Sequence, residues 1–163
     1  MRIPTKDIPQ ADNLSDVLRT VDAVAAGASS DREMGEAIGK GPRNGRYYRR
    51  AAEILGFIDS AGPNNSVLTG RGRSYVEACE ARKKEMALGA VLGAPIFQRV
   101  IPYLESRSPR GCTLDEFKAF LRGGYGKDSL DDDPAASEQY YWVAQILGAG
   151  ESQNGTICLG SFA

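Results

Sequence analysis

Five basic residues lie close together in one stretch of the chain, with no acidic residue between Ala37 and Ala52. They are Lys40, Arg43, Arg46, Arg49 and Arg50. Ammonium and guanidinium groups attract phosphate, and a guanidinium can also donate two hydrogen bonds to the edge of one guanine. The stretch therefore predicts an anion-binding surface. Its spacing predicts that a helix carries that surface.

The residues around these charges predict a helix with two unlike faces. At about 100° per residue, one face carries Tyr48, Ala51, Ala52 and Leu55. The nearly opposite face carries Arg46, Arg49, Arg50 and Glu53. We expect Asn44 to cap the start of this helix and Gly56 to end it.

Further elements must position the basic helix. Asn13 with Asp16 predicts the start of a first helix that runs to about residue 26, and Ser30 with Glu33 is a capping box for a short second helix. After the basic helix, two short apolar runs flank a turn at residues 62–65 and predict a hairpin. Thr69 is expected to cap a fourth helix. Its apolar face would carry Tyr75, Val76 and Cys79, and it would continue into the charged residues 80–85.

The second half of the chain repeats this order of signals. Pro95 suits the first turn of a helix, and Thr113 with Glu116 is a second capping box. The later segment EQYYWVAQILG aligns with RYYRRAAEILG when Ile146 is placed on Ile54. Asn154-Gly155 predicts a hairpin turn, with residues 156–159 as the returning strand. We therefore expect two tandem copies of one unit; the alternative is that two amphipathic helices share these residues by chance.

The two copies differ in charge. In place of the five basic residues, the second copy carries Asp128, Asp131, Asp132, Asp133 and Glu138. A phosphate backbone would attract the first surface and repel the second. Tyr141 and Trp142 of the second copy either pack on the first copy or form a surface for a protein partner.

The totals exclude several classes of protein. The chain has 20 basic and 21 acidic residues, so only the distribution of charge argues for nucleic acid. No apolar run reaches the roughly 18 residues of a membrane span, and the N-terminus has no secretory h-region. The cysteines Cys79, Cys112 and Cys158 are odd in number and widely spaced, which favours buried thiols in a reducing compartment. We expect a cytoplasmic protein without a membrane partner.

The composition also limits catalysis. The chain has no histidine, the commonest general base, and no cysteine pair at the spacing of zinc ligands. Residues 115–118, Asp-Glu-Phe-Lys, contain an acid-x-lysine unit of the kind that nucleases use to hold a metal. We expect this unit to lie in a helix and to have no catalytic role. The sequence predicts no catalytic residue, no metal site and no cofactor.

The order helix, turn, basic helix, hairpin resembles a winged helix-turn-helix. A closer resemblance is to the N-terminal target-recognition regions of some Type II restriction endonucleases. The residues that carry it are IPQADNLSDVL, RNGRYYRRAAEILGFI, VLTGRGR and GAPIFQRVIPYL. The resemblance implies an α+β, mainly helical fold with two tandem winged-helix subdomains, each a three-helix unit with a β-hairpin wing. We expect an N-terminal arm at residues 1–12, a DNA-reading copy at 13–84, and a second copy at 85–163 used for packing or for a partner.

The expected function is sequence-specific binding of double-stranded DNA, as the target-recognition part of a restriction endonuclease. Arg46 and Asn44, with Arg43 as a further candidate, would approach base edges, while Arg49, Arg50 and Lys40 would neutralise phosphates. The full set expected at DNA is Lys40, Arg43, Asn44, Arg46, Tyr47, Arg49, Arg50, Arg71 and Arg73. A stand-alone transcriptional regulator and a winged-helix scaffold that binds protein are the alternatives. A nuclease domain, a protein partner or a second copy of the chain is left open as a further partner.

Overall fold

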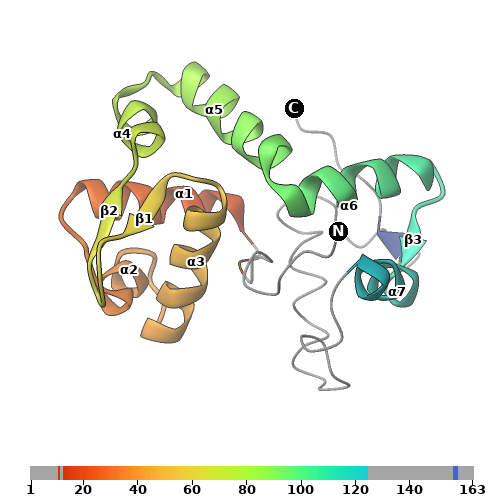
Figure 1. Cartoon of the computed structure of the whole chain (residues 1–163), viewed down its shortest axis with the longest axis horizontal. Coiled ribbons are helices and arrows are strands. Elements are labelled where there is room, and N and C mark those ends of the chain that lie inside the picture. The colour runs from red at the N-terminus through yellow and green to blue at the C-terminus, as the bar shows by residue number, and fades with distance from the viewer. Residues whose placement is uncertain (1–10, 12, 125–155, 158–163) are drawn as a thin grey trace. The chain divides into compact units, whose positions relative to one another are not determined.

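The computed structural model describes Ala11, residues 13–124, Thr156 and Ile157. The chain divides into two compact units, one at Asn13–Ala94 and one that includes Pro95 onward. The described parts are mainly helical, with two small antiparallel sheets of two strands each (Figure 1). This confirms the expected mainly helical α+β class.

The first unit begins with three helices, α1 (Leu14–Ala25), α2 (Asp31–Ala37) and α3 (Pro42–Ile54). The expected caps of the first two are confirmed. The Asn13 side chain accepts a hydrogen bond from the backbone N–H of Asp16. The side chain of Ser30 accepts from the N–H of Glu33, whose carboxylate accepts from the N–H of Ser30 in return. These bonds satisfy N–H groups that have no partner inside the helix.

The expected cap of α3 is wrong. Gly41 is the N-cap and Pro42 the first helical residue, so Asn44 lies inside the first turn with an exposed side chain. The reason is that proline suits this first position, because its fixed φ is already helical and it lacks an N–H that would need a partner. At the other end, Gly56 has a φ of 80° and ends the helix as expected.

Two glycines bring α2 and α3 into close contact. A Cβ on Gly45 would lie 1.9 Å from the carbonyl oxygen of Asp31, and a Cβ on Gly35 would lie 2.5 Å from that of Gly41. No side chain fits at either position. The apolar side of α3, formed by Tyr48, Ala51, Ala52 and Leu55, is buried as the spacing predicts.

The expected hairpin is present as β1 (Ile58–Ser60) and β2 (Ser66–Leu68). The strands pair antiparallel, with Ile58 opposite Leu68 and Ser60 opposite Ser66. The N–H of Ser66 also donates to the carbonyl of Ser29, 3.1 Å away, just before α2. The hairpin is thereby held to the start of the second helix.

The expected fourth helix is in fact two helices, α4 (Gly70–Glu77) and α5 (Glu80–Gly93). Thr69 caps α4 as expected, but Ala78 is extended and ends it. Cys79 is the N-cap of α5 rather than part of an apolar face, and it is exposed rather than buried. The acidic Glu80 stands in the first turn of α5, where the helix dipole favours a negative charge.

The second unit contains α6 (Pro95–Ser106), β3 (Cys112–Thr113), α7 (Leu114–Gly124) and β4 (Thr156–Ile157). Its core contains the buried side chains of Ile96, Phe97, Val100, Leu104, Phe117 and Leu121. Thr113 and Glu116 form the expected reciprocal cap, with N–O distances of 2.9 and 3.1 Å. β3 pairs antiparallel with β4, placing Cys112 opposite Ile157.

Several expectations lie outside the described residues. They are the N-terminal arm apart from Ala11, the acidic residues of the second copy, its helix at 138–148, the turn at Asn154-Gly155, and Cys158. The expected boundary between residues 84 and 85 falls inside α5, whereas the two compact units divide after Ala94. Among the described helices, none is by itself long and apolar enough to cross a membrane; α5 and α6 reach that length and composition only when counted together as a bent pair.

Candidate nucleic-acid interface

The outward side of α3 carries the most exposed part of the expected site. Arg43, Asn44 and Arg46 are exposed there, and Tyr47 and Arg50 are half-buried. All five residues belong to one helix that is fixed from behind by the contact between α2 and α3. The geometry therefore presents three arginines, an asparagine and a tyrosine on one side of a rigidly supported helix.

Arg43 and Tyr47 form a pair on this surface. The Nε of Arg43 donates a hydrogen bond to the Tyr47 hydroxyl oxygen at 2.9 Å. The Arg43 guanidinium carbon also lies 5.6 Å from the centre of the Tyr47 ring. The hydrogen bond to Tyr47 raises the pKa of Arg43 above its ordinary value. Tyr47 thus holds the guanidinium in one orientation.

Lys40 was expected to neutralise phosphate, but its ammonium group contacts other residues of the fold. Its Nζ donates to the Tyr48 hydroxyl at 2.9 Å and lies 3.5 Å from a carboxylate oxygen of Asp16. Asp16 comes from α1, and Tyr48 is buried in the core. Lys40 therefore joins α1 to α3, and its charge is compensated within the fold.

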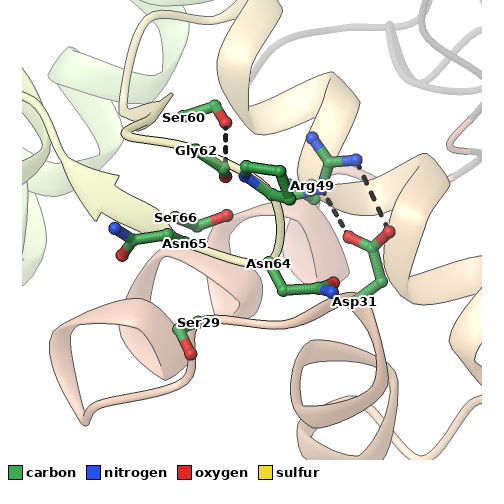
Figure 2. Close-up of a pocket in the computed structure, with 9 residues that line it drawn as sticks. Ser29, Asp31, Arg49, Ser60, Gly62, Asn64, Asn65 and Ser66 are labelled. Carbon is green, nitrogen blue, oxygen red and sulfur yellow. Dashed lines mark hydrogen bonds and ion pairs between the residues drawn. The ribbon is translucent and has the colours of Figure 1, made fainter.

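Arg49 is also compensated within the fold. It forms an ion pair with Asp31 at the start of α2 (Figure 2). It forms a second ion pair with Glu53, whose carboxylate is 2.7 Å away. Burial acts to lower the pKa of Arg49, but its hydrogen bonds to Asp31 and Glu53 outweigh it, so the pKa is raised. Arg50 shares Glu53 at 2.9 Å and is the more exposed of the two, at 42% against 21%.

Arg71 and Arg73 hold the ends of neighbouring elements. Arg71 donates to the carbonyl of Leu55 at 3.1 Å, where α3 ends, and Arg73 donates to the carbonyl of Leu68 at 3.1 Å. A positive charge at the last carbonyls of a helix is stabilising. Both residues therefore have a structural task in addition to any contact with phosphate.

Arg46 differs from these basic residues. It is exposed, and within the part of the chain that the structure describes it makes no hydrogen bond or ion pair. Of the five basic residues in the stretch, Lys40, Arg49 and Arg50 are paired with carboxylates, whereas Arg43 and Arg46 have no carboxylate partner among the described residues. The uncompensated positive charge of the stretch thus lies in the first half of α3.

A small hollow of about 110 Å³ lies beside this helix. Its lining comes from the β1–β2 hairpin, from Ser29 and Asp31 around the start of α2, and from Arg49 (Figure 2). Figure 2 shows the Arg49 guanidinium turned to Asp31, so this charge is already paired. The described residues include no cluster of side chains able to hold a metal ion. The acid-x-lysine unit at residues 115–118 lies within helix α7, as expected. The carboxylate of Glu116 accepts a hydrogen bond from the N–H of Thr113 at the start of that helix.

Sequence reasoning missed the acids that pair with the basic stretch. Asp16 and Asp31 precede Lys40 and Arg49 by more than a helix length, so inspection of neighbouring residues cannot find them. Glu53 is four residues after Arg49, and this spacing on a helix is the only feature of the sequence that predicts one of these ion pairs.

Comparison of the chain with protein-family models, with curated proteins and with solved structures gave no match.

Proposed function

We propose that the chain binds double-stranded DNA through the exposed side of α3. The observation that carries the proposal is the pair Arg43 and Arg46, which form no ion pair within the described part of the chain and lie in the first half of a helix whose opposite side packs closely on α2. A helix presented in this way fits the major groove, and its exposed donors can reach base edges and phosphates.

The arrangement of the first unit supports a winged helix-turn-helix. Its order is three helices followed by a two-stranded hairpin, with α2 and α3 in close contact and joined by a short turn. In this assignment α3 is the recognition helix and β1–β2 is the wing. The wing turn carries Asn64 and Asn65 but no basic residue, so α3 supplies most of the attraction for phosphate.

The second unit supports the proposal of a tandem repeat. In both units a capping box begins the second helix, at Ser30 and at Thr113. In both units the residue before that cap lies against a strand further along the chain. The N–H of Ser66 donates to the carbonyl of Ser29, and Cys112 is opposite Ile157 in an antiparallel pair of strands. Two amphipathic helices alone would not share this pairing.

We further propose that this module is the target-recognition part of a restriction endonuclease. This setting rests on the resemblance of the quoted segments, and the coding sequence adjoining this chain tests it. A nuclease domain encoded in the same reading frame or a neighbouring DNA methyltransferase supports it; a genomic context without either one favours the regulator.

The DNA-binding proposal is tested by fluorescence anisotropy with a labelled duplex of random sequence over a series of salt concentrations. The logarithm of the affinity should fall linearly with the logarithm of salt concentration. Arg46→Ala should remove about one phosphate contact and so make this slope shallower by about one unit. Arg82→Ala is the matched control, because it removes an exposed arginine from α5 of the same unit. The proposal is wrong if the wild-type chain binds no duplex at low salt, or if Arg82→Ala weakens binding as much as Arg46→Ala.

A further inference from the structure

We infer that Arg43 is the base-reading arginine of α3, that Tyr47 is its positioning residue, and that the base it reads is guanine. This inference rests on the proposed function and deepens it. From the sequence we expect Arg46 and Asn44 at base edges, with Arg43 as a further candidate, so the structure leads to a different assignment.

The first step is the geometry of the pair. The two residues are four positions apart on α3, so their side chains lie on the same side of the helix. Tyr47 accepts a hydrogen bond from Nε of Arg43 at 2.9 Å, and its ring lies 5.6 Å from the guanidinium carbon. The Nε position of the guanidinium is therefore occupied, and the plane of the group is constrained.

The second step concerns the donors that remain. A guanidinium has five N–H donors in a rigid fork, and Nε supplies one of them. Among the described residues, no acceptor engages either Nη of Arg43. The two Nη groups together can donate to two acceptors in one plane. Guanine presents such a pair in the major groove, O6 and N7, whereas adenine presents a donor beside its N7.

The third step is the comparison with Arg46. Arg46 is exposed on the same helix but has no tyrosine or other described partner to hold its guanidinium. A long side chain without such a partner loses more rotational freedom when it docks in one orientation. A phosphate accepts donors over many orientations, so Arg46 suits the backbone better than a base edge.

The test begins with a pool of duplexes that carry a randomised central segment. The wild-type chain is used to select bound duplexes, and the base preference is measured at each position. Arg43→Ala should remove a guanine preference of roughly 5- to 150-fold at one position, the range for one two-pronged contact. Tyr47→Phe keeps the ring but removes the hydroxyl, and it should lose part of the same preference at the same position.

Two further measurements separate positioning from a merely structural role. The double variant Arg43→Ala/Tyr47→Phe should lose no more preference than Arg43→Ala alone, because Tyr47 acts through Arg43. Tyr47→Phe should leave the salt slope unchanged, since it removes no positive charge, whereas Arg46→Ala should reduce the slope by about one and keep the guanine preference.

The inference is overturned if Arg46→Ala rather than Arg43→Ala removes the guanine preference, or if Tyr47→Phe retains it in full. It is also overturned if the wild-type chain binds duplexes with no preference at all, an outcome that leaves the DNA-binding proposal intact. Absence of any duplex binding would instead overturn both.

Discussion

At Gly45 the lack of a side chain determines how closely α3 lies on α2. A Cβ at this position would lie 1.9 Å from the carbonyl oxygen of Asp31, far inside the contact distance of real atoms, and backbone rather than a movable side chain is in the way. Gly89, in α5, has nothing within 4 Å of the same added atom. A side chain therefore cannot be accommodated at Gly45, whereas one can be added at Gly89.

Gly45→Ala should destabilise the first unit by about 1–3 kcal/mol or more, because the two helices must move apart. Gly89→Ala should stabilise it by about 0.5–1 kcal/mol, because alanine is the better helix former and nothing obstructs it. Urea denaturation followed by circular dichroism measures both changes. A Gly45→Ala variant as stable as the wild type would contradict the close contact of α2 with α3.

Arg49 shows why a run of basic residues does not define a binding surface. Its neighbours in sequence contain no acid on the N-terminal side, yet Asp31 and Glu53 both pair with it. The position of Arg49 on the polar side of α3 was predictable from the sequence. Its role was not, because Asp31 comes close to Arg49 only when α2 packs on α3. The same holds for Lys40 and Asp16.

Arg49→Ala is accordingly expected to act on stability. It leaves two carboxylates close together without their shared partner, and it should cost about 1–3 kcal/mol, since the group is partly exposed to solvent. Urea denaturation gives the free energy of unfolding, and anisotropy at a temperature where the variant is folded gives the DNA affinity. A variant with wild-type stability and a shallower salt slope would show that Arg49 contacts phosphate instead.

Among the elements, the capping boxes were the easiest to predict and the break between α4 and α5 the hardest. Ser30 and Glu33, like Thr113 and Glu116, follow a local pattern whose hydrogen bonds span three residues, so the sequence alone contains all the partners. The break at Ala78 and Cys79 has no glycine or proline to mark it. Local propensity continues through it, so only the packing of the whole unit ends α4 there.

The cap at the start of α2 has a consequence for pH. Hydrogen bonds from the backbone N–H groups of Ser29 and Ser30 lower the pKa of Glu33 from the ordinary value of 4.5 to about 2. A carboxylate whose pKa is lower in the folded state contributes stability above 4.5, and loses it as the pH falls toward 2.

Glu33→Gln should therefore have a lower melting temperature than the wild type near neutral pH. The difference should shrink as the pH falls from 4.5 to about 2, where the wild-type carboxylate is also protonated. Thermal unfolding at a series of pH values measures it. Glu36→Gln, a change to an exposed carboxylate of the same helix outside the cap, is the control. A melting-temperature difference for Glu33→Gln that is constant over this range would contradict the role of the charged cap.

For the molecule as a whole, each compact unit has a core of its own. Leu55 belongs to the first and is 3% exposed, and Leu121 belongs to the second and is 2% exposed. The sequence predicted the order of helices and strands in the first unit as far as α4, and the buried side of α3 that includes Leu55, because helical periodicity is a local signal. It missed where one unit ends and the next begins, because α5 continues through the repeat boundary that the alignment suggested.

Leu55→Ala and Leu121→Ala should each cost about 2–5 kcal/mol, because a truncated side chain leaves a cavity in a small core. Leu55→Ala should speed hydrogen exchange at amides of α1 and α3, and Leu121→Ala at amides of α6 and α7. Mass spectrometry of exchanged peptides from the whole chain separates these regions. Equal acceleration in both regions from either variant would mean that the two units unfold as one.

The contacts of α3 also determine which of its residues can be replaced over generations without loss of the fold. The residues that hold the helix in place, Gly45, Tyr48 and Arg49, face other elements of the fold, whereas Arg43, Asn44 and Arg46 face outward. Mutations at the outward positions leave the supporting contacts unchanged and remain compatible with folding. Under the proposed function, a lineage carrying this unit could therefore acquire a new DNA target by replacing a few side chains of one helix, while the chain stays folded at each step.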